Sequence, residues 1–311
     1  MRTFSHPGYK RFLLSVGCLL SIHFTALFFL TLFRLVFFFS ANYDFPDQEH
    51  VGFMSIWPAF IRGVWFDNVI ACYILLIPLV AVSISALFNY YGKILWNVTC
   101  IFFSLFYGIV LLVTAANIPY FQYFFKIINS SVFNWFGYMN TTAGMVFGET
   151  SYYPPLIGFL LTLVLFIWLM RRLIRHFQRL LNTKNPSVFW LDRIYIFLTA
   201  GICIGLCLFG IRGRTGYNPI KVSAAYYCTD PFLNQLGISP VFNLLSSTLD
   251  DSRKENRYLH LMPENEALEN TRHYLNRPGI EGISPIARQI NASDSLRRPN
   301  IVLIFMESMS A

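Results

Sequence analysis

The stretch Leu13–Phe39 reads LLSVGCLLSIHFTALFFLTLFRLVFFF and decides the fold class of the chain. A helix crosses the hydrocarbon core of a bilayer with about 20 residues, so this run is long enough to span a membrane. It exceeds the apolar core of a secretory signal, which has about 7 to 15 residues, and no A-x-A-like cleavage site follows it. We therefore expect a retained membrane helix here.

The chain as a whole has the composition of a membrane protein. Of its 311 residues, 55% are hydrophobic and 13% are charged, whereas about 25% of residues in soluble domains are charged. We therefore expect an α-helical membrane protein whose first domain, residues 1–211, contains five transmembrane helices. The four further apolar runs that supply the remaining spans are Val69–Phe88, Ile94–Ala116, Pro155–Met170 and Val188–Ile211.

The charges in the loops between these runs predict the orientation of the chain. Lys and Arg in short loops favour the cytoplasmic side. The amino-terminal segment and the loop after Met170 are basic, whereas the loop 40–67 holds four acids and one arginine. We expect a cytoplasmic amino terminus, with everything after Ile211 outside. The net charge of +8 then reflects attraction to anionic lipid headgroups and not nucleic-acid binding, since residues 212–300 hold 11 basic and 9 acidic residues.

Ionisable residues within the apolar runs are candidates for function. His23 and Arg34 are eleven residues apart and project from nearly the same face of the first helix. A structural alternative exists for both, because Arg34 lies near the outer end and can reach the headgroups, and His23 can bond to a neighbouring helix. Asp192 and Arg193, at the inner start of the fifth run, are interpreted as a boundary ion pair.

The segment 117–155, between the third and fourth runs, is too polar to span a membrane and too aromatic for a solvated loop. Trp and Tyr prefer headgroup depth, so we expect it to lie in the membrane interface, with a flat helix after Pro119. It is either a plain anchor or a path for a lipid headgroup. In the second case the candidate residues are Lys126, Asn129 and Glu149.

Beyond the fifth run, residues 212–298 have the pattern of an extracytoplasmic helical linker. Asp230 and Ser239 each precede a proline, which is typical of a helix N-cap followed by its first helical position. The sequence PENEALENTRHYLN (263–276) predicts an amphipathic helix with acids in its first turn.

The last segment of the sequence, residues 299–311, changes character again. Ile301–Met306 is a continuous apolar run that predicts a strand buried on both faces of an α/β sheet. Glu307 follows it directly, and ligand-binding groups lie at the carboxyl ends of strands in such sheets. Its carboxylate is an oxygen ligand suited to Mg²⁺, Mn²⁺ or Zn²⁺.

The stretch RPNIVLIFMESMSA (298–311) resembles the first core strand of the alkaline phosphatase and sulfatase superfamily, in its lipoteichoic acid synthase and phosphoglycerol transferase branch. Members of that branch share the pattern PN, four to six apolar residues and ES. They also have a five-span anchor, an aromatic outer loop and a helical linker. True sulfatases carry paired aspartates where this chain has Glu307 and Ser308. The resemblance therefore argues against sulfate-ester hydrolysis.

The resemblance implies a multi-pass protein of a bacterial-type plasma (inner) membrane that serves the cell envelope. It implies a metal-dependent transferase in which a threonine nucleophile takes phosphoglycerol from phosphatidylglycerol; phosphoethanolamine transfer from phosphatidylethanolamine is the alternative. The metal, Mn²⁺, Mg²⁺ or Zn²⁺, would be held partly by Glu307.

No catalytic nucleophile maps onto this chain, so we expect a truncated sulfatase-like domain that holds no metal and turns over no lipid by itself. A non-catalytic membrane protein that binds lipid or recruits partners remains the alternative from a different class.

Overall fold

The computed structural model describes six stretches of the chain: residues 6–41, 53–181, 190–253, 261–276, 287 and 302–303. The chain divides into two units, residues 1–253 and residues 254–311.

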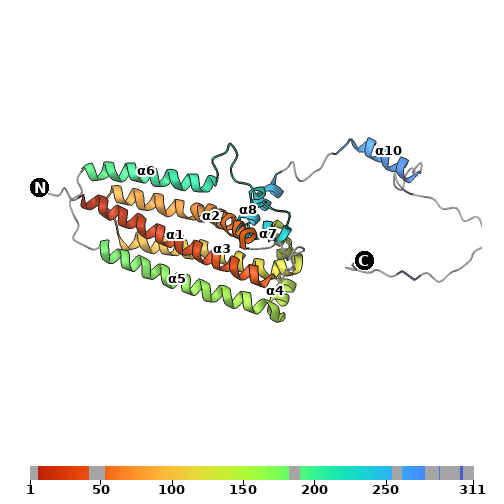
Figure 1. Ribbon diagram of the computed structural model, residues 1–311, viewed down its shortest axis with the longest axis horizontal. Helices are drawn as coiled ribbons and strands as arrows, with labels where there is room; N and C mark the ends of the chain where they lie inside the picture. Colours follow the sequence, from red (N-terminus) through yellow and green to blue (C-terminus); the bar gives the residue numbers. More distant parts are fainter. Residues whose placement is uncertain are drawn as a thin grey trace, which may run out of the picture. The chain divides into compact units, whose positions relative to one another are not determined.

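Five long helices make up most of the first unit and lie side by side (Figure 1). Each is long and apolar enough to cross a membrane, which confirms the five spans expected from the sequence. Consecutive long helices run in opposite directions, so their ends gather at two opposite ends of the bundle. The helices are α1 (Pro7–Ser40), α2 (Phe53–Leu87), α3 (Lys93–Phe124), α5 (Tyr153–Leu181) and α6 (Trp190–Arg212).

Several of these helices extend well beyond the apolar runs that predicted them. α2 begins at Phe53, although its apolar run begins at Val69, and it continues through two internal prolines. α3 continues through Pro119 and ends at Phe124, and the next residue, Phe125, has the left-handed conformation with φ 53°. The expectation of a separate flat helix after Pro119 is therefore wrong. Proline is tolerated inside membrane helices because the surroundings can satisfy the freed backbone groups.

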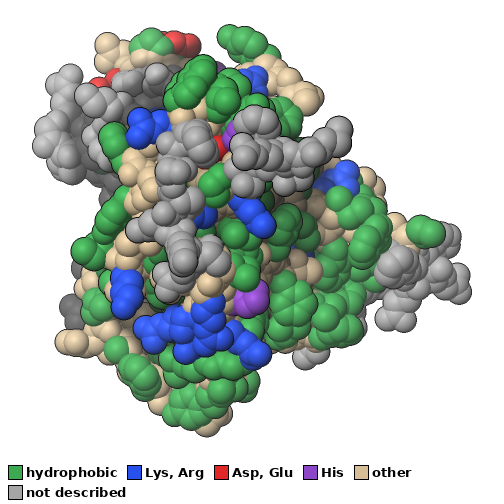
Figure 2. All heavy atoms as spheres, turned by 90° about the vertical axis from the view of Figure 1, so that its left-hand side faces the viewer, with side chains coloured by type: hydrophobic (Ala, Val, Ile, Leu, Met, Phe, Trp, Pro, Cys, Tyr) green, Lys and Arg blue, Asp and Glu red, His purple; other side chains and the backbone are tan. Residues whose placement is uncertain are grey.

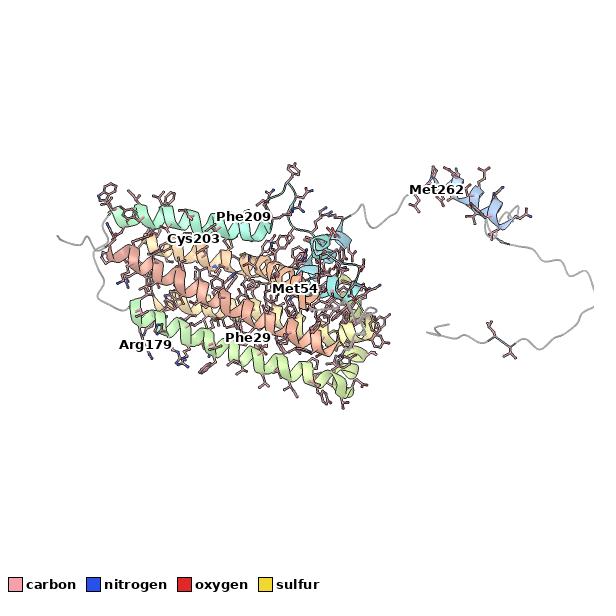
Figure 3. The ribbon with its side chains drawn as sticks, viewed as in Figure 1. Phe29, Met54, Arg179, Cys203, Phe209 and Met262 are labelled. Carbon is pink, nitrogen blue, oxygen red and sulfur yellow. The ribbon has the colours of Figure 1, made fainter. Side chains whose placement is uncertain are left out.

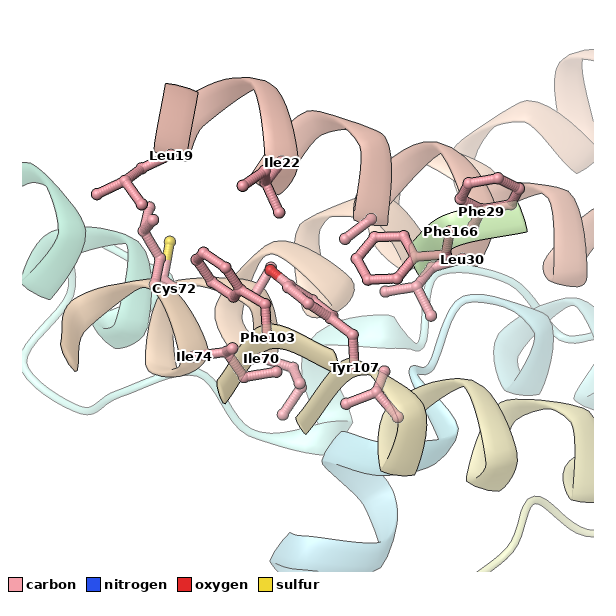
Figure 4. Close-up of a cluster of buried hydrophobic side chains, with 14 of the residues drawn as sticks. Leu19, Ile22, Phe29, Leu30, Ile70, Cys72, Ile74, Phe103, Tyr107 and Phe166 are labelled. Atoms are coloured by element: carbon pink, nitrogen blue, oxygen red, sulfur yellow. The ribbon is translucent and has the colours of Figure 1, made fainter. Parts of the chain in front are cut away.

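The core of the bundle lies where α1, α2 and α3 meet (Figure 4). Phe103 and Tyr107 of α3 are fully buried there. The ring of Phe166, from α5, packs edge-on against the rings of Tyr107 and Phe29, with centroid distances of 5.3 Å and 6.1 Å. Such aromatic contacts stabilise beyond the apolar area that they bury. The close packing therefore fixes α5 against α1 and α3.

The outer helices present apolar side chains away from the bundle. Within the most apolar 18-residue stretch of each helix, the buried share is 61% in α2 but only 11% in α5 and 17% in α6. Figure 3 marks Phe209 on α6, and this side chain is 51% exposed. Apolar faces of this extent are expected where helices contact lipid.

One end of the bundle, which we call the basic end, carries the start of α1, α3 and α6 and the finish of α2 and α5. Figure 2 looks onto this end and shows Lys and Arg side chains gathered on it. Asp192 is the acid among its described residues, and the described basic residues there are Lys10, Arg11, Lys93, Arg171, Arg172, Arg175, Arg179 and Arg193.

Short helices cover the opposite end of the bundle, which we call the loop end (Figure 1). Both proline-initiated helices expected in the linker are present, α7 and α8, and the Asp230 side chain caps α7 by accepting from the Leu233 amide at 2.8 Å. Ser239 makes no such side-chain cap. The short elements are η1 (Ser130–Tyr138), α4 (Met139–Gly148), η2 (Thr150–Tyr152), η3 (Val222–Ala225), α7 (Pro231–Leu236) and α8 (Pro240–Ser252).

The second unit contains the helix α10 (Glu264–Leu275), at the position that the sequence predicted. Glu264 and Glu266 occupy its first turn, where acids favour the helix dipole. Val302 and Leu303 are described, are highly exposed and have no strand assignment. The other residues of the predicted strand, and the predicted metal ligand Glu307, lie outside the described residues. Both therefore stay predictions.

Candidate functional site: an apolar groove at the loop end

A groove of about 790 Å³ lies at the loop end, between α3 and α5 and beneath the short elements that join them. We call it the interfacial groove. Its deep wall consists of Leu112, Ala116 and Pro119 of α3, with Leu156 and Phe159 of α5 facing them. These side chains are all apolar. The side chains in the deep part of the groove therefore offer no hydrogen-bonding groups to a ligand. This part suits a hydrocarbon chain.

Three aromatic rings form one side of the groove. Tyr120 and Phe124, one turn apart on α3, lie with their centroids 4.8 Å from each other. Trp135 of η1 lies 5.7 Å from both rings. All three line the groove. Since α3 continues through Pro119, Tyr120 and Phe124 stay in helical register and can meet the Trp135 ring.

Polar side chains gather around the η1, α4 and η2 part of the groove: Tyr138, Thr141, Thr142, Glu149 and Tyr152. Glu149 is the residue that precedes η2. The Thr142 hydroxyl donates to the Trp135 carbonyl at 3.4 Å. The groove is therefore amphipathic, with hydroxyl groups and one carboxylate at the short elements and hydrocarbon between the long helices.

The depth of the groove follows from the helix rise. Leu112 is twelve residues before Phe124, the last residue of α3, which corresponds to about 18 Å along the helix axis. The hydrocarbon core of a bilayer is about 30 Å thick. The apolar wall is therefore long enough to lie along an acyl chain in one leaflet.

The three residues predicted to form a headgroup path are not all brought together. Glu149 lines the interfacial groove, whereas Lys126 and Asn129 do not belong to its lining. Asn129 caps η1: its side-chain oxygen accepts from the Ser131 amide at 3.1 Å and from the Tyr120 hydroxyl at 3.4 Å. Lys126 is exposed beyond the end of α3. Asn129 thus shapes the loop that holds Trp135.

Arg34 has partners that the sequence did not predict. Its guanidinium donates to the Asp67 carboxylate at 2.6 Å, and both side chains are almost fully buried. It also donates to the backbone carbonyls of Leu236 and Ile238, the latter at 3.1 Å. Arg34 therefore joins α1 to α2 and to the end of α7. We call this the Arg34 junction.

The Arg34 junction needs a glycine on α2. A Cβ atom placed on Gly63 would overlap the Arg34 guanidinium. A buried charge is stable only when it is paired and hydrogen-bonded, and the missing side chain at Gly63 leaves the space for this pairing. The buried pair is therefore explained by structure, as is His23, whose ring nitrogen Nε2 lies 3.0 Å from the Asn68 side-chain oxygen on α2.

The boundary residue Asp192 also pairs with a partner that the sequence did not suggest. Asp192 is fully buried, and its carboxylate lies 2.7 Å from Nδ1 of His6, at the start of α1. The neighbouring Tyr9 hydroxyl lies 3.1 Å from the Thr199 hydroxyl. These contacts join α1 to α6 at the basic end.

Within the described residues, no three His, Cys, Asp or Glu side chains lie close enough together to hold a metal ion. No family model matches the chain, and no curated protein or solved structure matches it.

Proposed function

We propose that this chain is the membrane-embedded part of a lipid-headgroup phosphotransferase and that the interfacial groove receives the donor lipid. The observation that carries this proposal is the amphipathic groove itself, which runs between helices long and apolar enough to span a membrane. A phospholipid has the same division, with an acyl chain on one side and polar oxygens on the other. The groove would hold the chain and present the headgroup at the loop end.

The orientation that this function requires follows from the charges. The basic end would face the cytoplasm, because Lys and Arg are enriched there and anionic lipids attract them. The loop end and the linker would then lie outside. A reporter fused after Asp250 should be exposed outside the cytoplasm and one fused near Lys184 should be inside; the same side for both would contradict this orientation.

The reaction class rests on the resemblance of residues 298–311, with phosphoglycerol as the transferred group and phosphoethanolamine as the alternative. In that reaction a divalent metal would polarise the phosphoryl group and activate the nucleophile. Glu307 supplies one ligand at most, whereas a catalytic metal site of this kind needs three or more. The residues that line the interfacial groove would bind and orient the lipid.

A non-catalytic lipid-binding protein is the second candidate function. The groove favours it, because the described residues that line it all lie between Leu112 and Phe159. The two candidates share lipid binding and differ in turnover. A chain extended beyond Ala311 by a sulfatase-like domain should release headgroups from labelled phospholipid with Mn²⁺, and Glu307→Ala should abolish the release; an extended chain without turnover would favour the non-catalytic role.

Lipid binding can be tested on the chain as it stands. The chain is placed in nanodiscs that contain phospholipid with a photoactivatable group on the acyl chain, and crosslinked peptides are mapped by mass spectrometry. Crosslinks should concentrate on residues 112–124 and 153–159. Ala116→Phe, which adds a ring to the groove wall, should reduce them several-fold. Ile202→Phe, on the exposed face of α6, is the matched control and should leave them unchanged.

Equal labelling of all exposed helix faces, unaffected by Ala116→Phe, would show that the groove receives no particular lipid. That result would contradict the proposed function.

A further inference from the structure

The 3₁₀-helix η1 presents one side to the interfacial groove. Val132, Trp135 and Tyr138 all line the groove, and they follow one another at intervals of three residues. Side chains at this spacing eclipse each other in a 3₁₀-helix, so the three form one row along η1. The position of η1 therefore decides how much of the space between α3 and α5 this row fills.

α8 holds the backbone at the start of η1 through a row of polar side chains. Asn243, Ser247 and Asp251 are four residues apart, so they share one face of α8. The Asn243 amide donates to the Ile128 carbonyl at 2.9 Å, and the Ser247 hydroxyl accepts from the Ser130 amide at 2.9 Å. The Asp251 carboxylate accepts from the Ser130 hydroxyl. These bonds fix the chain at residues 128–130, where η1 begins.

α8 is in turn anchored to the bundle. The ring of Phe242, at its start, lies 4.8 Å from the ring of Phe66, which is fully buried on α2. Ile127 and Ile128 belong to the same apolar cluster, and the side-chain oxygen of Gln235, on α7, accepts from the Ile127 amide at 3.1 Å. α2 therefore fixes α8, and α8 fixes the start of η1.

We propose that α8 regulates the interfacial groove, with Asn243, Ser247 and Asp251 as positioning residues that act on a bound lipid through η1. This inference rests on the proposed function, since it assumes that the groove holds a lipid. None of the described residues that line the groove belongs to α8. When the three side chains release η1, the ring of Trp135 loses its fixed place beside the acyl chain, and lipid binding weakens although the groove wall is unchanged.

Two serines on α8 provide a matched pair of variants. The hydroxyls of Ser247 and Ser252 each donate to the carbonyl three residues earlier, at 3.1 Å and 2.7 Å. Ser247 in addition accepts from the Ser130 amide. Alanine favours a helix at either position, so Ser247→Ala and Ser252→Ala leave α8 equally helical and differ in the bond to η1.

The first measurement is hydrogen exchange of the backbone amides of residues 130–138. Ser247→Ala should accelerate this exchange about three- to ten-fold, the factor expected for one hydrogen bond, whereas Ser252→Ala should leave it unchanged. Ser247→Thr keeps the hydroxyl and should keep the slow exchange. The core amides of α2 are the internal reference. If they accelerate as much as those of η1, the bond serves overall stability, and the inference is overturned.

The second measurement is lipid labelling in nanodiscs that contain phospholipid with a photoactivatable acyl chain. Ser247→Ala should lower the crosslinks on residues 112–124 and 153–159 by a factor similar to that of the exchange, with unchanged labelling of the exposed face of α6. Ser252→Ala and Ser247→Thr should label like the unchanged chain.

The outcomes separate this inference from the proposed function. The same exchange at residues 130–138 in Ser247→Ala and Ser252→Ala shows that α8 does not hold η1 and overturns the inference. Faster exchange with unchanged groove labelling also overturns it, but leaves lipid binding in the groove. Labelling of the unchanged chain with no preference for the groove overturns the proposed function, and the regulation by α8 with it.

Discussion

The Arg34 junction and the interfacial groove both lie at the loop end, and they differ in how much open space they contain. At the junction a buried guanidinium meets one carboxylate and two backbone carbonyls, in a space that Gly63 leaves open. In the groove about 790 Å³ of space is lined mainly by hydrocarbon, with hydroxyls and Glu149 at the short elements. The first arrangement holds the fold together, and the second is available to a ligand.

The largest effect is expected from breaking the Arg34 junction. Asp67→Ala leaves a buried guanidinium without its carboxylate, and removal of one partner of a buried ion pair costs about 3 to 5 kcal/mol. The free energy of unfolding, measured by denaturant titration in detergent micelles, should fall by this amount. Asp250→Ala is the control, because Asp250 pairs with Arg253 at an exposed site and should cost less than about 1 kcal/mol.

A double variant tests whether the loss comes from the unpaired charge. Arg34→Met combined with Asp67→Leu replaces the pair by apolar groups and should recover most of the stability lost in Asp67→Ala. If Asp67→Ala alone were as stable as the unchanged protein, the Arg34 junction would not hold the helices together.

A smaller effect is expected from Gly63→Ala. The added Cβ atom overlaps the Arg34 guanidinium, which must move away from Asp67. Forcing an extra methyl into a packed site costs about 1 to 3 kcal/mol. Gly158→Ala is the matched control, because a Cβ atom there meets nothing within 4 Å. Equal stability changes in the two alanine variants would show that Gly63 makes no space for Arg34.

Alkaline pH should weaken the contact of the linker with α2. The Tyr227 hydroxyl donates to the Ser55 carbonyl at 2.5 Å, and burial, followed by the neighbouring Cys228, raises the pKa of Tyr227 above its ordinary value near 10. The folded state therefore holds this proton more tightly. The stabilisation that the protonated Tyr227 hydroxyl contributes is fully present below pH 10 and is lost as the pH rises above it.

Tyr227→Phe should remove this pH dependence. The measurement is the thermal midpoint between pH 8 and pH 11, where the unchanged protein should lose more stability than the variant. Parallel curves for the two proteins would contradict the assigned role.

The smallest effect on stability is expected in the groove. Ala116→Phe adds a ring at an exposed position, so its cost is limited to the difference in helix propensity, about 0.5 kcal/mol. The same change should reduce lipid labelling several-fold. A loss of stability as large as that of Gly63→Ala would mean that the groove wall is packed and not open to a ligand.

The sequence predicted the number of long helices correctly because apolar runs of sufficient length are a strong local signal. It misplaced their ends. The start of α2 was expected at Val69, which left Asp67 in a loop, but the helix begins at Phe53 and places Asp67 opposite Arg34. A pairing between residues 33 positions apart depends on the packing of two helices, and no local pattern reports it.

The groove could be predicted only in part. The concentration of aromatic residues in 117–155 indicated the membrane interface, and Glu149 was among the candidates. The error at Pro119 concealed the rest, because a helix that restarts there would not carry Tyr120 and Phe124 in register with Leu112 and Ala116. Lys126 and Asn129 were candidates for the headgroup path because of their residue type. Residue type does not show on which side of the chain a groove forms.

A cryo-EM map of the chain in phospholipid nanodiscs, with a rigid antibody fragment bound to add mass, tests the central claim most directly. The account predicts elongated density between α3 and α5, from the level of Leu112 to a headgroup near Glu149. The contradicting result is a map in which Phe124 and Trp135 close the space between the two helices and lipid density is found only on the outer faces of α5 and α6.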